Sequence, residues 1–180
     1  MTPENSEDPR VKDPHWNPIR NIILPDAKRQ PDRSLAIVLG SVVEAQLGDL
    51  IVNRLVDNKK IADKLFTGLG PLNNFAGKID LGFLLGLYGK ETASMLHAIR
   101  GIRNLFAHEM LPLNFESPII VKKAQPLTFI NQFGRGKPRA GRPLYIGACE
   151  FVLGGLFAVA SDRRRFKSPV PGKAPSGTIE

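Results

Sequence analysis

The residues best suited to chemistry lie in one short stretch, where Arg103 and Asn104 are followed closely by His108. An arginine can stabilise charge on a phosphate, and an imidazole titrates near neutral pH and can transfer a proton. At about 100° per residue, Asn104 and His108 share one helix face with Arg100, whereas Arg103 lies about 140° from His108. The stretch therefore predicts an anion-binding or catalytic site that a second helix or a second subunit must complete. The same residues could equally form an ordinary polar helix face.

Other catalytic chemistries have little support in the sequence. Its three histidines, His15, His97 and His108, show no metal-binding spacing, so neither a metal nor another cofactor is expected. No GxSxG motif is present, and the one cysteine, Cys149, lies in an apolar stretch where a thiol is unreactive. A single cysteine suits a reducing, cytoplasmic environment, and the acidic, polar N-terminal residues indicate no secretory signal.

The chain of 180 residues has a formal net charge of +8, which favours anionic partners, including nucleic acid. Most of this excess lies in residues 131–168, which hold eight cations and two acids. Few aromatic residues lie among these charges, so a platform for stacking bases is not indicated. A solubilising surface with a basic tail is an equally good interpretation. The residues that we expect to contact nucleic acid are Arg100, Arg135, Lys137, Arg139, Arg142, Arg163, Arg164 and Arg165.

The elements that must position these residues are helices. Apolar residues recur at helical spacing from Pro31 to Leu55, and Met95, Ile99, Ile102 and Phe106 form one stripe of a helix that begins near Lys90. Asn58 and Asn74 are suitable caps for helices over 59–66 and 75–87. Residues 144–160 form an apolar run at the short limit for a membrane span. Because this run contains Glu150 and three glycines, we expect a buried core helix and no membrane. The predicted fold is all-α, a compact bundle of about five or six helices.

The domain organisation expected is one helical domain between two tails. Residues 1–31 are rich in proline and charge and predict a disordered arm, and residues 32–161 predict the domain. Within it, residues 118–143 predict an irregular basic segment. Ser117-Pro118 is a good helix start, yet the β-branched residues that follow could be extended. Residues 162–180 predict a basic, disordered tail.

The order of the motifs resembles a known family. The stretch Arg103-Asn104-Leu105-Phe106-Ala107-His108 resembles the Arg-Asn-x-x-x-His signature of HEPN-type four-helix domains. Residues 31–108 resemble the bacterial mannitol operon repressors more specifically. The stretches that carry this resemblance are Asp32–Leu39, Leu55–Lys60, Pro71-Leu72 with Phe75–Leu81, Leu85–Lys90, the signature helix and the segment after it, Asn114–Pro118.

The HEPN resemblance implies metal-independent RNA cleavage across a homodimer. His108 would act as general base or acid, and Arg103 would stabilise charge on the phosphate. Asn104 would orient one of them, and Glu44 could support the pair from an earlier helix, although such a glutamate is more often simply solvated. Met110 replaces a tyrosine found in some HEPN toxins, which argues against that subtype.

The mannitol operon repressor resemblance implies regulation instead of catalysis. That branch is regarded as regulatory, and no DNA-reading helix-turn-helix is evident in this sequence. We therefore expect a cytoplasmic, homodimeric regulator that acts through protein partners or through nucleic-acid contacts that do not read sequence. The alternatives are the metal-independent ribonuclease and a helical protein-interaction module without a nucleic-acid role.

Overall fold

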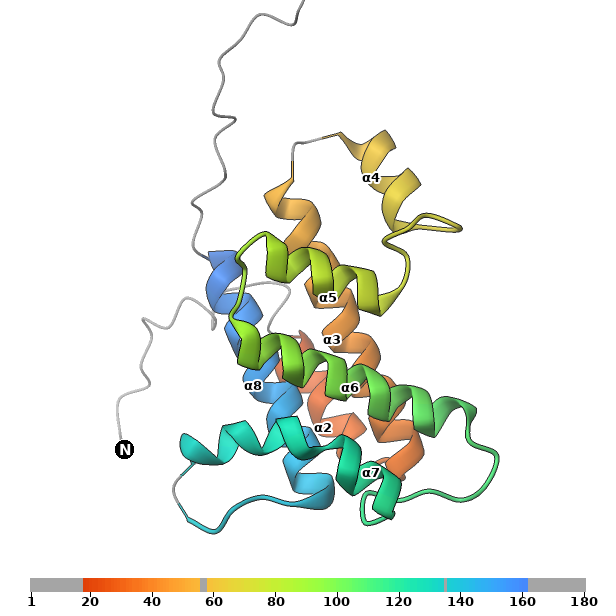
Figure 1. Cartoon of the computed structure of the whole chain (residues 1–180), viewed down its shortest axis with the longest axis vertical. Coiled ribbons are helices and arrows are strands. Elements are labelled where there is room, and N and C mark those ends of the chain that lie inside the picture. Colours follow the sequence, from red (N-terminus) through yellow and green to blue (C-terminus); the bar gives the residue numbers. More distant parts are fainter. Residues whose placement is uncertain (1–17, 56–57, 135, 162–180) are drawn as a thin grey trace, which may run out of the picture.

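A computed structural model of the chain describes residues 18–55, 58–134 and 136–161, and all regular structure in them is helical (Figure 1). The all-α prediction is confirmed. Within these residues, five α-helices have eight or more residues, in agreement with the expected number. They are α3 (Asp32–Arg54), α4 (Lys59–Phe66), α5 (Phe75–Leu84), α6 (Lys90–His108) and α8 (Gly141–Ser161). The shorter elements are the π-helix η2 (Ile19–Ile23), α2 (Leu24–Ala27), α7 (Pro118–Lys123) and the 3₁₀-helix η3 (Gln125–Gln132).

Helix α3 is the centre of the bundle. Tyr145 near the start of α8 donates a hydrogen bond to the carbonyl of Ala36, and Arg54 at the end of α3 donates to that of Val159, so the two helices run parallel. Helix α6 runs antiparallel to α3 on another side, with α5 packed against both (Figure 1). The helical spacing predicted for α3 is confirmed by side chains with no exposed surface, among them Leu35, Leu39, Val43, Leu47 and Ile51.

Helices α3 and α8 are also the two described helices long and apolar enough to cross a membrane by length and composition. Half of the apolar stretch of each is buried inside the bundle. A core helix that is covered by its neighbours on most sides carries the same apolar composition. The apolar run at residues 144–160 lies in α8, which packs against α3 in the core.

The helical domain begins earlier than predicted. Ile19, Leu24 and Ala27 of η2 and α2 are buried in the core. The prediction of a disordered arm through residue 31 was therefore wrong for residues 18–30, because three apolar anchors outweigh the proline-rich composition. Residues 1–17 and 162–180 lie outside the described residues, and the disorder predicted for them stays a prediction.

The segment 118–143 is also more regular than predicted. Residues 118–132 form α7 and η3, with Pro118 at the first helical position and Ile120, Leu127 and Ile130 buried. Burial of these side chains at helical spacing outweighs the weak preference of β-branched residues for strands. The irregular part is therefore confined to residues 133–140, of which residue 135 lies outside the description.

The two predicted asparagine caps are confirmed. The side chain of Asn58 accepts a hydrogen bond from the backbone N–H of Ile61 at 3.1 Å, and that of Asn74 accepts from Gly77 at 2.8 Å. Helix α5 ends at Leu84, three residues before the predicted end, where Gly86 adopts a positive φ of 68°. Such a φ is unfavourable for residues with a Cβ atom, so this glycine ends the helix and turns the chain toward α6.

Candidate functional site

Arg103 lies in the junction of α3, α5 and α6. Its Nη2 donates to Glu44 Oε2 at 2.5 Å, and Lys78 Nζ donates to Glu44 Oε1 at 3.0 Å. We call these three residues the Glu44 network. Their side chains are only 13–24% exposed, so solvent screens their attraction much less than at an open surface. The Arg103 guanidinium also lies over the Phe75 ring, 5.8 Å from its centroid. One carboxylate therefore joins two cations from two other helices.

The close approach of α6 to α3 depends on Gly40. A Cβ atom at this position would lie 2.9 Å from both Cβ and Cγ of Arg103, well inside van der Waals contact. The bare backbone of Gly40 lets the arginine stem cross α3 at this point, and the guanidinium then reaches Glu44 one turn further along the helix. Glu44 was predicted as a possible support for Arg103, and the structure brings the two together. The alternative of a solvated glutamate was wrong.

His108 and Asn104 lie on a different side of α6. His108 is the last residue of the helix and is exposed, whereas Asn104, one turn earlier, is half-buried. Both line a shallow hollow of about 330 Å³, which we call the α6–α7 hollow. Its other lining residues are Gly101, Leu105, Glu109 and Lys123.

The α6–α7 hollow combines four polar groups with different chemistry. The stem of Lys123 from α7 crosses α6 at Gly101, where a Cβ atom would lie 2.9 Å from Lys123 Cδ. An imidazole, an amide, a carboxylate and an ammonium group thus line one open surface. The amide and ammonium groups can bind an anion, although the hollow also contains the Glu109 carboxylate.

A single chain therefore divides the Arg-Asn-x-x-x-His motif between two surfaces. Arg103 points into the Glu44 network, and it does not line the hollow that holds Asn104 and His108. This is the separation expected from the five-residue spacing. The composite site that was predicted to form across a dimer is not present within one chain and stays a prediction.

The basic residues predicted to contact nucleic acid occupy different environments. Lys137 and Arg139 are exposed in the loop before α8, and Arg100 is half-buried with its Nε atom buried and without a hydrogen-bond partner in the described residues. The loop is held at Arg139, whose backbone N–H donates to Asn131 Oδ1 at 2.9 Å. Four of the predicted residues lie outside the described residues, namely Arg135, Arg163, Arg164 and Arg165.

The prediction that Arg142 belongs to a free basic loop was wrong. Arg142 is the second residue of α8, and its guanidinium forms an ion pair with Asp32 at the start of α3. It also donates to the carbonyls of Lys28 at 3.0 Å and Gln30 at 2.6 Å. Arg142 thus fastens α2 and α3 to α8, and its donors serve the fold and not a polyanion.

The buried titratable groups offer no nucleophile. Burial raises the pKa of the Cys149 thiol and that of the Tyr145 hydroxyl well above their ordinary values, so both are neutral at physiological pH. The Tyr145 hydroxyl donates to the Ala36 carbonyl at 2.9 Å. In the part of the chain that the structure describes, no group of three or more His, Cys, Asp or Glu side chains is arranged to hold a metal ion.

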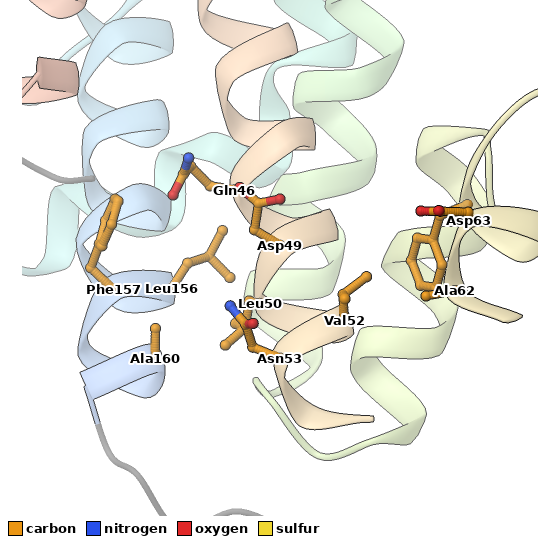
Figure 2. A pocket seen from close by; sticks show the side chains of 11 residues that line it. Gln46, Asp49, Leu50, Val52, Asn53, Ala62, Asp63, Leu156, Phe157 and Ala160 are labelled. Atoms are coloured by element: carbon orange, nitrogen blue, oxygen red, sulfur yellow. The ribbon is translucent and has the colours of Figure 1, made fainter. Parts of the chain in front are cut away.

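One cleft of the described residues was missed by sequence reasoning. It measures about 600 Å³ and lies where α3 and α8 end, with α4 along one side (Figure 2). We call it the terminal cleft. The signal that could have found it is α4 itself, an amphipathic helix of eight residues with no buried side chain. The apolar face of α4 is only partly covered, with Phe66 packed against the core, and such a face indicates a surface open to another segment.

Comparison of the chain with models of protein families, with curated proteins and with solved structures finds no match.

Proposed function

We propose that the chain is a non-catalytic regulatory protein, similar to the mannitol operon repressors. It acts through protein partners and through contacts with polyanions that do not read sequence. The observation that carries this proposal is the position of Arg103. Its guanidinium is bound to Glu44 inside a three-helix junction, so the residue that would stabilise a reacting phosphate has a structural role in the folded chain.

The exposed basic residues outside the Glu44 network are better suited to binding polyanions than to catalysis. Lys122 and Lys123 are exposed on α7 beside the α6–α7 hollow, and Lys137 and Arg139 are exposed in the loop before α8. The sequence adds three further arginines beyond α8, at 163–165. Exposed lysine and arginine side chains neutralise phosphates and release counterions, which produces affinity without base recognition.

The ribonuclease remains the second candidate because one observation favours it. His108 is exposed and shares the α6–α7 hollow with Asn104 and Lys123, so a phosphate could approach an imidazole there. Catalysis would still need a further cation at the phosphate, which Arg100 or a second chain, in a homodimer with α6 at its interface, would supply. A helical interaction module without a nucleic-acid role is the third alternative.

Incubation of the purified full chain with total RNA in EDTA separates these candidates. We expect the RNA to remain intact while it binds, and we expect unrelated RNA and DNA sequences to bind with similar affinity. Neutralising several phosphates should lower this affinity by about 10³-fold or more between 50 and 200 mM salt. Cleavage that disappears in a folded His108→Ala variant would select the ribonuclease. Absence of any binding to polyanions would leave the interaction module.

A further inference from the structure

The terminal cleft has an apolar floor between two helices of the bundle. Leu50 of α3 and Leu156 of α8 lie there and are only 3% and 4% exposed. Figure 2 shows both side chains between their helices, with Ala62 and Asp63 of α4 standing apart from them. Phe66 of α4 also lines the cleft and is half-buried. The cleft is therefore a groove between the bundle and a short amphipathic helix, a shape that accepts an apolar side chain from another segment.

The charge of the cleft is opposite to that of the chain as a whole. Its ionisable lining residues are Asp49 of α3 and Asp63 of α4, and both are exposed. No cation is among the lining residues in the described part of the chain. Gln46 and Asn53 provide further polar groups. In a protein with a net charge of +8, this acidic and apolar groove fits a segment that is basic and carries an apolar anchor.

Helix α4 provides a reason for the groove to be filled. It has eight residues, and helices of this length are marginal in water unless their apolar face packs against something. Ala62 and Phe66 face the cleft, yet no residue of α4 is buried. A segment lodged between α4 and the α3–α8 wall would bury this face and fix the helix against the bundle.

We propose that the occupant is the C-terminal segment of the same chain, Arg163-Arg164-Arg165-Phe166-Lys167. It begins two residues after α8 ends at Ser161, and Ala160 already lines the cleft. The five residues from Ser161 to Phe166 span at most about 17 Å when extended, which suffices to place the ring in a groove that starts at Ala160. Phe166 enters the apolar floor, and the arginines pair with Asp49 and Asp63.

Charge distinguishes this segment from the other end of the chain. Residues 1–17 contain four acids and two basic residues, whereas residues 162–180 contain five basic residues and two acids. The N-terminal segment would therefore be repelled by Asp49 and Asp63, although it carries Trp16 as an apolar group. Both charge and position select the C-terminal segment.

Docking of the segment has a regulatory consequence that rests on the proposed function. The same arginines cannot pair with the cleft and with phosphates at once, so a polyanion and the cleft compete for them. The docking itself requires no nucleic acid and is tested without it.

The test uses the full chain with a spin label on Ser168→Cys, because the native Cys149 is fully buried and does not react. Paramagnetic broadening of the backbone amides of Asn53 and Ala62 is measured by NMR in the absence of nucleic acid. We expect strong broadening at both. The broadening should weaken in the double variant Asp49→Asn/Asp63→Asn. An exposed ion pair contributes about 0.2–1 kcal/mol, so its loss lowers the ratio of docked to free segment by up to about fivefold. Phe166→Ala should weaken the broadening as well.

Asp26→Asn is the matched control, because Asp26 is an exposed acid on α2, near the opposite end of α3. It should leave the broadening unchanged. Equal broadening in the charge-neutralised variant and the native chain, or none in either, would overturn the proposal. Broadening that arises only between labelled and unlabelled molecules would assign the cleft to a second copy and would also overturn it. Failure of RNA binding with normal broadening would reject the proposed function and leave the docking intact.

Discussion

Replacing Glu44 with glutamine tests whether the motif arginine has a structural role. The substitution keeps the shape of the side chain and removes the charge that holds Arg103 at 2.5 Å and Lys78 at 3.0 Å. Two cations from different helices are then left facing each other without their anion. The expected result is a marked loss of stability in a chain that still folds.

The magnitude follows from the burial of the network. Removing one partner of a fully buried ion pair costs about 3–5 kcal/mol, and a hydrogen bond to a charged group contributes about 1.5–3 kcal/mol. The side chains of Glu44, Lys78 and Arg103 are 18%, 13% and 24% exposed, so water compensates part of the loss. We expect Glu44→Gln to cost about 2–4 kcal/mol and Arg103→Ala about 1–3 kcal/mol. His108→Ala should cost about 0.5 kcal/mol or less, because that side chain is exposed.

Urea unfolding followed by circular dichroism at 222 nm measures these differences. With a slope of about 2 kcal/mol/M, the loss in Glu44→Gln shifts the midpoint by about 1–2 M. Asp80→Asn is the matched control, because the Asp80–His97 pair also joins α5 to α6, at 3.3 Å, but is largely exposed. It should shift the midpoint little, since exposed pairs contribute about 0.2–1 kcal/mol. The reasoning is refuted if Glu44→Gln is no more destabilising than Asp80→Asn, or if His108→Ala costs as much as Arg103→Ala.

Two further predictions concern the fold. The raised pKa values of Tyr145 and Cys149 mean that both contribute stability below their ordinary pKa values of 10.0 and 9.0. As the pH rises above these ordinary pKa values, each group lowers the free energy of unfolding by up to about 1.4 kcal/mol per pH unit. The urea midpoint should therefore be constant to about pH 8.5 and fall at higher pH. The fall should be less steep in Tyr145→Phe, which lacks one of the two groups. A midpoint unchanged up to pH 10.5 would contradict this. Arg142→Ala should cost about 1–3 kcal/mol, because it frees Asp32 and two carbonyls, whereas Lys137→Ala should shift thermal unfolding little. Equal effects of the two substitutions would mean that Arg142 is not a structural anchor.

The helices could be predicted from sequence wherever one local pattern determined the outcome. Asn58 and Asn74 marked helix starts because a short polar side chain that satisfies a free backbone N–H is a local device. The same holds for the apolar spacing of α3. The helices at residues 19–27 were missed because each is short, and burial of Ile19 and Leu24 in the common core stabilises them. No local pattern reports such tertiary packing.

Only those features of the site that follow from the geometry of a single helix could be predicted from the sequence. The angle between Arg103 and His108 follows from their spacing, and the structure agrees with it. The resemblance, and not helix geometry, named Glu44 as a possible support for Arg103, because that contact joins residues 59 positions apart and requires a glycine at position 40. The structural role of Arg142 was hidden for the same reason, since Asp32 lies 110 positions away. Basic residues in a glycine-rich stretch look alike in sequence whether they are free or paired.

The Glu44 network also constrains what a ribonuclease on this scaffold would look like. For Arg103 to reach a phosphate beside His108, it would have to leave Glu44, at a cost of about 1.5–3 kcal/mol for the charged hydrogen bond alone. Arg100 faces no such cost from an ion pair in the described residues, and by helix geometry it lies nearer to the side that carries Asn104 and His108. A nuclease built here would therefore use Arg100, or a cation of a second chain, at the phosphate. The Arg-Asn-x-x-x-His spacing alone thus does not establish the catalytic role of its own arginine.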